Sequence, residues 1–532
     1  MTNAAAMTGG FSRRTFLEQL SRVGGTALVM AGMQALGFGI GSAGAEPPQL
    51  TGGAKGRKVI VLGTGVAGLS AAYELSTAGY DVTVLEARDR IGGRSYTARR
   101  GTKLTEYGGE PQVCTFDEGH YINPGPWRIP YMHQGYLHYA RKFRVPVELF
   151  NNDNDHSFIN FEKGKGPLAA TPVRKQEVAA DMRGYASEML AKCVRQGALD
   201  QEFGPGDKEL FLDYLRSEGY LTPADFKYVG TDGRGFDVNP GAGVDPGPGK
   251  PSTPHKLGDI LQSETWRVLK SVSAFDQQRT MFEPVGGMDQ LPAGFVRNLK
   301  LTVQVGHVVE KIAQDENSVT VSYATADGQH GSVTADYCVC TIPLSVLKSI
   351  DVQCAPKFKE AMNGVAYALV GKIGLQMKTR FWEEKYNIYG GHIYVDDPDV
   401  QSISFPSTGW LGEKGVLLGY YGHGSAAAKV SALSLEGRKQ FALAAGKKTF
   451  PEYADACDSA FSIAWHRVPF NLGGWAQWTD EGRASYYPTL CEPDGRLYLV
   501  GEHLSYITGW QEGGIESAWQ QIGKLHARVH AA

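Results

Sequence analysis

Apolar and polar positions after residue 57 follow the order strand, helix, strand. Residues 58–62 form a short apolar run, which is typical of a buried parallel strand. Residues 69–78 carry apolar side chains at helical spacing, and Gly79 ends the pattern. Residues 81–85 repeat the strand pattern. This segment is therefore predicted to form a βαβ unit.

The middle of the chain changes from helical to strand-like patterns. Helical spacing recurs in the segments 136–144, 174–195, 208–218 and 256–270. The Gly- and Pro-rich residues 239–251 predict a loop among them. Residues 365–480 alternate strand patterns with turns. We therefore expect a helical region followed by a second sheet.

The last patterns return to the first unit. A predicted helix over 289–299 leads into a predicted strand over 302–312, and Asp327-Gly328 predicts a hairpin turn. Residues 336–342 and 496–500 are typical of buried strands. These elements predict an α/β fold in which the first domain is assembled from separated stretches of chain.

The turn between the first strand and helix has the sequence GTGVAG, residues 63–68, which is the dinucleotide fingerprint. Gly63 permits the tight turn, Gly65 lets the backbone approach a pyrophosphate, and Gly68 lets helix and strand pack closely. The N-terminus of the following helix offers free N–H groups to phosphates, and Ala67, within the fingerprint, is a further candidate for binding the cofactor. Glu86, after the second strand, is placed to bind ribose hydroxyls. We therefore predict a bound adenine dinucleotide.

Residues 87–94, with the sequence ARDRIGGR, extend this unit. They resemble the extension by which flavin oxidoreductases of the amine oxidase superfamily carry Arg and Gly-Gly to the phosphates and ribityl chain of FAD. The resemblance implies that Ala87, Arg88, Gly93 and Arg94 bind FAD. The alternative is a solvated loop whose arginines bind nothing.

Composition narrows the choice of function. The chain has 532 residues, of which 20% are charged and 42% hydrophobic, and its net charge is −3. This length predicts two or three domains, and the charge gives no electrostatic case for binding nucleic acid or an anionic membrane. The seven cysteines are scattered and include no CxxC pair, which argues against a disulfide scaffold or a zinc cluster. We predict no metal.

Residues 1–45 have the pattern of a targeting segment. Arg13-Arg14 form a twin-arginine pair, an apolar stretch covers 23–43, and Ala-Gly-Ala follows at 43–45. These features predict a bacterial Tat signal. We therefore expect a periplasmic or secreted protein without stable membrane insertion after processing; the alternative is an N-terminal tail or an uncleaved membrane anchor.

A Pro- and Gly-rich loop contains GPWRIP, residues 125–130. It resembles the Gly-Pro-Met-Arg-(Leu/Phe)-Pro segment of L-amino-acid oxidases and tryptophan monooxygenases, which runs under the flavin. The resemblance implies that Pro126, Trp127 and Arg128 contact the flavin and that Arg128 also anchors the substrate carboxylate. A planar guanidinium suits that role because it forms two parallel charge-assisted bonds with a carboxylate.

Further family motifs follow in the same order. GGMDQLP at 286–292 matches one of them. Val309 lies in the strand predicted after this motif, and the resemblance implies that its backbone contacts the adenine. Gly501-Glu502 resembles the Gly-Glu motif, which implies that Glu502 binds the ribityl chain.

Residues 509–518 resemble the last motif of the family. The resemblance implies that the carbonyl of Gly509 receives the substrate amine and that Trp510 walls one face of the flavin. It also implies that a helix N-terminus at Gly514 and Ile515 bonds the pyrimidine side.

Two strands of the second sheet carry further candidates. Lys372 matches a family lysine that holds a water against flavin N5, although a lysine at a solvent-facing edge is the alternative. Tyr420 aligns better than Tyr421 with a tyrosine that binds the carboxylate, although the local gap leaves both open. Trp465 and Trp475 are candidate pocket walls or ordinary core residues.

The resemblance covers nearly all of residues 57–532. It implies an α/β fold with a Rossmann-type FAD-binding domain of the GR2 or amine oxidase kind, a mixed-sheet substrate domain and a helical insertion. The expected FAD-binding domain comprises 57–94, 281–350 and 485–532, the substrate-binding domain 95–150 and 351–484, and the helical domain 151–280.

The implied function is that of an FAD-dependent L-amino-acid oxidase, which makes a 2-oxo acid, ammonia and hydrogen peroxide. The expected partners are an L-amino acid, aromatic or large and apolar, dioxygen, and further copies of the chain in a homodimer or larger assembly. FAD is expected to be non-covalent because no Cys lies near 471–474, where covalent relatives have one. The alternatives are an amine or polyamine oxidase, a tryptophan-2-monooxygenase-like enzyme, and a flavin-binding protein without oxidase turnover.

Overall fold

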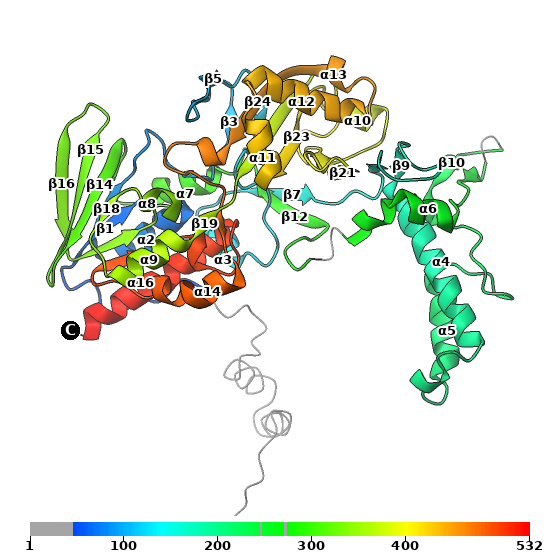
Figure 1. The fold of residues 1–532 in the computed structure, drawn as a ribbon, viewed down its shortest axis with the longest axis horizontal. Coiled ribbons are helices and arrows are strands. Elements are labelled where there is room, and N and C mark those ends of the chain that lie inside the picture. Colours follow the sequence, from blue (N-terminus) through cyan, green and yellow to red (C-terminus); the bar gives the residue numbers. More distant parts are fainter. Residues whose placement is uncertain (1–45, 245–246, 271–273, 532) are drawn as a thin grey trace, which may run out of the picture.

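The computed structural model describes residues 46–244, 247–270 and 274–531. Residues 1–45, and with them the predicted Tat signal, lie outside the described residues. Figure 1 shows a body of two sheet-containing parts and a helical arm that projects from it. No helix of the described residues is long and apolar enough to span a membrane.

A five-stranded parallel sheet forms the first part of the body. Its strand order is β13-β2-β1-β17-β26, which puts the first strand at the centre. The strands are β1 (Lys58–Leu62), β2 (Asp81–Leu85), β13 (Val303–Gln304), β17 (Tyr337–Cys340) and β26 (Leu497–Leu499). The predicted βαβ unit is thus present, with its helix α2 starting at Val66 (Val66–Thr77), directly after the glycine turn.

Both faces of the parallel sheet are covered. Val59 and Val61 of β1 pack toward α2 and α16 (Gln511–Ala531), while Ile60 and Leu62 pack toward the opposite layer. That layer is the four-stranded sheet β16-β15-β14-β18 with helices α8 (Leu344–Leu347) and α9 (Pro356–Gly364). The sheet consists of β14 (His307–Gln314), β15 (Val319–Thr325), β16 (His330–Ala335) and β18 (Asp351–Val352).

A seven-stranded mixed sheet forms the second part of the body. Its order is β24-β20-β23-β22-β21-β8-β9, and only the β21–β8 pair is parallel. The strands are β8 (Phe158–Asn160), β9 (Val173–Arg174), β20 (Val370–Met377), β21 (His392–Val395), β22 (Ser402–Ser404), β23 (Gly415–His423) and β24 (Cys457–Ala464). One face packs on α10 to α13, and β20 is buried along its whole length.

Short paired strands and helices connect these layers. The strand pairs are β3 (Ala98–Arg99) with β6 (Tyr121–Ile122), β4 (Lys103–Leu104) with β5 (Gln112–Val113), β7 (Val147–Asn151) with β12 (Thr280–Pro284), and β19 (Ala366–Tyr367) with β25 (Ala476–Gln477). The helices are α3 (Gln134–Lys142), α7 (Gln290–Asn298), α10 (Phe381–Glu384), α11 (Gly424–Ser431), α12 (Leu435–Lys447), α13 (Tyr453–Ala456), α14 (Asp480–Ser485) and α15 (Tyr487–Cys491).

The helical arm comprises α4 (Lys175–Arg195), α5 (Asp207–Glu218) and α6 (Leu257–Ser263), with a hairpin of β10 (Phe236–Val238) and β11 (Lys250–Pro251). Four predicted helical segments are therefore helical, although the last one ends in a 3-10 turn, Thr265–Lys270. The range 151–280 is not helical throughout, because β8 and β9 add to the mixed sheet. These two strands are too short to show a periodic pattern in the sequence.

Candidate active site

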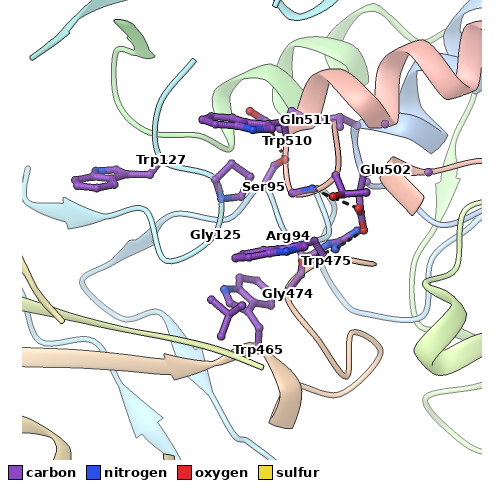
Figure 2. A pocket seen from close by; sticks show the side chains of 18 of the residues that line it. Arg94, Ser95, Gly125, Trp127, Trp465, Gly474, Trp475, Glu502, Trp510 and Gln511 are labelled. Carbon is purple, nitrogen blue, oxygen red and sulfur yellow. Dashed lines mark hydrogen bonds and ion pairs between the residues drawn. The ribbon is translucent and has the colours of Figure 1, made fainter. Parts of the chain in front are cut away.

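A cavity of about 420 Å³ lies between the parallel sheet and the mixed sheet. Its walls come from the turn after β1, the segment 124–128, strands β20 and β23, and the start of α16. In Figure 2, Trp510 and Gln511 lie on one side of this space, and Trp465, Gly474 and Trp475 lie on the other. The cavity therefore joins residues that are far apart in the sequence.

The glycine turn is built for an anionic ligand. Gly63 has φ +98°, which favours glycine, and a Cβ on Gly68 would lie 2.0 Å from the carbonyl oxygen of Gly63. A Cβ on Gly65 would meet no atom within 4 Å, so the space in front of this turn is open to a ligand. No side chain caps the N-terminus of α2. Its free N–H groups therefore remain available for a phosphate.

Glu86 stands at the end of β2, beside the same turn. Its Oε2 accepts hydrogen bonds from the Thr64 amide (2.9 Å) and hydroxyl (2.5 Å), and its Oε1 accepts from the Arg88 amide (3.0 Å). These bonds fix a buried carboxylate where the first two strands end. The Arg88 side chain donates to Asn471 Oδ1 (2.6 Å) and to the carbonyl of Pro469, and burial lowers the pKa of Arg88 to about 10.

A second polar cluster forms where β26 ends. Arg94 pairs with Glu502 at 3.0 Å and also donates to the carbonyl of Gly474. Glu502 accepts a further bond from the Ala476 amide at 3.2 Å. Its carboxylate is buried. Both side chains line the cavity, at the end that Figure 2 shows opposite Trp127.

Arg128 is the cation at the other end of the cavity. One hydrogen bond is present, from Nη2 to Gln277 Oε1 at 2.9 Å, while Nε is buried without a partner. No carboxylate of the described residues forms an ion pair with it. Burial lowers the pKa of Arg128, and the Tyr421 hydroxyl and Asp276 partly offset this. A guanidinium with spare donors in an enclosed cavity is a receptor for an anion.

Lys372 is buried beside Arg128. Its Nζ donates to the carbonyl of Gly125 at 2.6 Å and lies 4.5 Å from the centre of the Tyr421 ring. Burial, helped by the charge of Arg128, lowers the pKa of Lys372 well below its ordinary value. A neutral amine that faces a cavity can hold a water and accept a proton.

Comparison with known proteins assigns the family. The profile of the flavin containing amine oxidoreductases matches residues 66–521. The chain belongs to this family. The L-amino-acid oxidase of Vipera ammodytes ammodytes is 29% identical over 87% of this chain and 91% of its own length. BmooLAAO-I, an L-amino-acid oxidase of Bothrops moojeni, is 28% identical over 87% of this chain and 88% of its own length.

Two solved structures share the fold of this flavin-containing amine oxidoreductase. A cyclohexylamine oxidase from Brevibacterium oxydans IH-35A superposes with a TM-score of 0.57 at 17% identity, covering 90% of this chain and 99% of that one. A putrescine oxidase with bound putrescine has a TM-score of 0.56 at 17% identity, with the same two coverages. The predicted α/β class, with an amine-oxidase-like nucleotide-binding part, a mixed sheet and a helical insertion, is confirmed.

The residues of this cavity fit a flavin. The open space before Gly65 and the uncapped α2 suit its phosphates, and the Arg94–Glu502 pair presents polar atoms farther along the cavity. His503 adds an Nε2 that is buried without a partner, and burial lowers its pKa to about 3, so a neutral ring faces the cavity.

Most of the predicted site residues meet at this cavity. Those that line it are Gly65, Ala67, Arg94, Pro126, Trp127, Arg128, Lys372, Trp465, Glu502, Gly509, Trp510 and Gly514. Trp475 lines it as well. Trp465 is held by a bond from its Nε1 to the carbonyl of Pro124 at 2.7 Å.

The remaining predicted residues do not line the cavity. They are Gly63, Gly68, Glu86, Ala87, Arg88, Gly93, Val309, Ile515 and Tyr420. Apart from the last two, they lie in three places: the fingerprint and the start of α2, the segment after β2, and the start of β14. Ile515 packs its side chain into the core formed by α2, α3 and α7, although its neighbour Gly514 faces the cavity.

Tyr421, and not Tyr420, faces the cavity, so the predicted preference for Tyr420 is wrong. The β20–β23 register runs from Ile373↔Tyr420 to Gly374↔Leu418, which leaves Gly419 as an extra residue. This β-bulge reverses the alternation along β23. Tyr421 therefore pairs with Lys372 and lines the cavity, while Tyr420 is buried on the other face.

Sequence reasoning missed several residues that line the cavity, among them His423, His503, Asp276 and Gln277. His423 had a weak signal, because it stands two residues after Tyr421 on the same strand face; enclosure lowers its pKa to about 4. Asp276 accepts a bond from Trp510 Nε1 at 3.0 Å. Asp276 and Gln277 lie in a loop before β12, and no local pattern places that loop over the cavity.

Proposed function

We propose that this protein is an FAD-dependent L-amino-acid oxidase. The observation that carries the proposal is the guanidinium of Arg128, which faces the cavity. Its Nε is buried without a partner, and the rest of the group has a single partner, the neutral side chain of Gln277. A substrate carboxylate would satisfy these donors. Each charge-assisted hydrogen bond contributes about 1.5–3 kcal/mol.

The other polar groups of the cavity suit the rest of an amino acid. The Tyr421 hydroxyl lies on the same wall as Arg128 and would give the carboxylate a second donor; burial raises its pKa and keeps it protonated. The carbonyl of Gly509, at the opposite wall, would accept from the substrate amine. Holding both ends of the amino acid fixes the direction of its Cα–H bond, and such orientation supplies much of the rate.

Bound FAD would supply the redox chemistry, as acceptor of the two electrons of the substrate Cα–H bond, which dioxygen would then take to become hydrogen peroxide. Lys372, whose pKa burial lowers, would hold a water and, in its neutral form, accept the proton that the amine loses. Water then hydrolyses the imino acid to a 2-oxo acid and ammonia. The aromatic walls Trp127, Trp465 and Trp475 favour aromatic or large apolar side chains.

Residues that would hold FAD run along the cavity and the sheet ends. Gly65 and the start of α2 would bind the phosphates, Glu86 the ribose, and Arg94 with Glu502 the ribityl chain. No cysteine of the described residues lines the cavity, which supports non-covalent binding. Acid precipitation should therefore release the flavin into the supernatant as FAD.

The deciding experiment adds twenty L-amino acids and a set of simple amines to the yellow protein without oxygen. L-amino acids should bleach the flavin, and the same reaction in air should give one peroxide per 2-oxo acid. An amide product would indicate a monooxygenase, and no bleaching would indicate a flavin protein without oxidase turnover. Arg128→Lys keeps the charge and loses the fork, so it should raise KM for L-phenylalanine about tenfold or more.

An amine oxidase is the second candidate. Asp276 supports it, because this carboxylate lines the cavity and acts on Arg128 through space. A closer Asp276–Arg128 pair would leave a site that needs no substrate carboxylate. Phenethylamine oxidation at a rate equal to that of L-phenylalanine would favour this candidate.

We further propose export by the Tat pathway and assembly as a homodimer or larger homo-oligomer. The twin-arginine pattern at Arg13-Arg14 supports export. The exposure of two large apolar side chains on the helical arm, Leu210 (69%) and Tyr214 (55%), supports assembly. Replacing both arginines with lysine should leave the protein in the cytoplasm. Light scattering of the exported protein should give at least twice the chain mass.

A further inference from the structure

A second cavity, of about 370 Å³, shares one wall with the first. Trp127 lines both of them. On the far side of Trp127, the paired strands β7 and β12 contribute Glu148 and Glu283, which stand directly opposite each other in the strand register. Like charges at such positions repel each other. The arrangement therefore requires a compensating group or a bound proton.

Glu283 lacks such a group among the residues that the structure describes. Its side chain is 4% exposed, lines the second cavity, and has an Oε1 without a hydrogen-bond partner. No cation within the described ranges acts on the pKa of Glu283 or of Glu148. An unsatisfied buried carboxyl is rare in proteins, and at a cavity wall it is free to contact a ligand.

The other titratable groups at this cavity do not neutralise the pair. Arg380 is already taken by Glu383 and by the carbonyls of Thr408 and Lys414. Burial lowers the pKa of His120, so its ring is neutral, and burial raises the pKa of Tyr121, so its hydroxyl keeps its proton. Among the described residues, no cation of the cavity wall therefore balances the two carboxyl groups.

We propose that the second cavity binds the cationic group of a small organic molecule, an ammonium or a guanidinium, between Glu148 and Glu283. Trp127 and Phe150, whose ring centres lie 4.9 Å apart in an edge-to-face arrangement, both line the cavity. Aromatic faces attract organic cations and add to the carboxylates.

The cation has two sources that share this chemistry. It is either the end of the side chain of a dibasic L-amino acid whose carboxylate lies on Arg128, or a separate amine. The first source rests on the proposed function, because it needs an amino acid in the first cavity. The second source does not.

Proton release distinguishes such binding from a structural role of Glu283. Burial, reinforced by Glu148, raises the pKa of Glu283 to about 8 in the empty cavity, so the carboxyl is mostly protonated at pH 7. A bound cation favours the carboxylate and expels the proton. Cation binding should therefore release close to one proton at pH 7 and tighten almost tenfold per pH unit up to about 8.

The first measurement is calorimetry of the yellow protein with butylguanidinium, at pH 6.5 to 9 and in buffers of different ionisation enthalpy. Benzoate, an aromatic carboxylate, is present to occupy the cavity at Arg128. The wild type should bind one butylguanidinium with proton release. Glu283→Gln should weaken binding at least tenfold and abolish the release, and Glu148→Gln should also weaken it. Glu310→Gln, at an exposed position of β14, is the matched control and should bind as the wild type does.

The second measurement compares L-lysine with L-norleucine, which has the same chain without the terminal amine. If the cation is the end of a substrate, Glu283→Gln should lower the ratio of their kcat/KM values at least tenfold. Glu310→Gln should leave the ratio within twofold. If the cation is a separate molecule, only the calorimetric result should change.

A positive result in either measurement supports the second site and identifies its source. The proposal is overturned if Glu283→Gln changes neither butylguanidinium binding, proton release nor the lysine-to-norleucine ratio by more than twofold. Absence of butylguanidinium binding to the wild type, with a normal ratio in Glu283→Gln, overturns it as well. If no L-amino acid bleaches the flavin, the proposed function fails, and calorimetry alone decides the second site.

Discussion

The two cavities beside Trp127 have opposite charges. The first cavity presents Arg128 and Lys372, and the second cavity presents Glu148 and Glu283. Burial lowers the pKa of Arg128 and Lys372 and raises the pKa of Glu283. In both cavities, these ionisable side chains are therefore shifted toward their neutral forms. Trp127 thus borders both a cavity with basic side chains and a cavity with acidic side chains.

The comparison shows that the same physical cause prepares both cavities. Removing an ionisable group from water disfavours its charged form, whichever sign it has. A ligand of opposite charge reverses this effect, because it stabilises the charged form again. Both groups keep a buried atom without a partner, Arg128 Nε and Glu283 Oε1, but Arg128 also has one neutral partner, Gln277. The following changes would break or sharpen this contrast.

Replacing Arg128 with alanine should have the largest effect. The substrate carboxylate would lose two charge-assisted bonds, so kcat/KM for L-phenylalanine should fall about 10²–10³-fold, or roughly 3–4 kcal/mol. Turnover of phenethylamine, which has no carboxylate, should change less than threefold. Arg100→Ala, on an exposed ion pair, is the control. Equal losses for both substrates would contradict the anchoring role.

Replacing Glu283 with glutamine should change how stability depends on pH. The folded protein binds this proton more tightly than the unfolded chain, since the pKa is raised from 4.5 to about 8. The favourable contribution is full below pH 4.5 and is lost as the pH rises toward 8. The wild type should therefore lose roughly 2–4 kcal/mol relative to Glu283→Gln over this range.

Thermal melts of both proteins at pH 5 and pH 8.5 measure this difference. The gap between their melting temperatures should move in favour of the variant at the higher pH. Parallel curves would show that Glu283 is ionised at neutral pH and would remove the contrast between the two walls.

Replacing Lys372 with methionine should slow the chemical step more than it weakens binding. The variant keeps the volume of the side chain and loses the amine that would hold water, so anaerobic flavin reduction by L-phenylalanine should slow roughly tenfold to thirtyfold. The dissociation constant of benzoate should stay within threefold. A large loss of benzoate affinity with normal reduction would assign Lys372 to substrate binding instead.

The adjacent tyrosines provide a matched pair with the smallest effect. Tyr421→Phe should lower kcat/KM about fivefold to tenfold through loss of one hydrogen bond to the carboxylate. Tyr420→Phe should leave kcat/KM within twofold and should not destabilise the protein, because the Tyr420 hydroxyl is buried without a partner. The reverse order of effects would contradict the observed register.

Local sequence signals placed the nucleotide-binding part. Gly63, Gly65, Gly68 and Glu86 stand within one βαβ unit, so their spacing predicted their arrangement. The predicted strand over 302–312 was less accurate, because Gly306, with φ +72°, divides it into β13 and β14. Interruptions of this kind depend on how a strand must bend to join two sheets, which no short pattern encodes.

The candidate site depended on long-range packing. Arg128 and Lys372 were placed at one cavity through the resemblance, and the structure brings them together. Asp276 and Gln277 could not be predicted, since their loop reaches the cavity through the pairing of β12 with β7. The second cavity was also missed, because Glu148 and Glu283 are far apart in the sequence and become neighbours only in that pair.

The bulge at Gly419 has a consequence for how this family diverges. A single inserted or deleted residue in β23 would exchange which of the two adjacent tyrosines faces the first cavity, without any change in side-chain identity. Evolution can thus retune such an enzyme by shifting phase along one strand. Comparisons of homologues that count matching letters, and overlook this offset, will equate tyrosines that point in opposite directions.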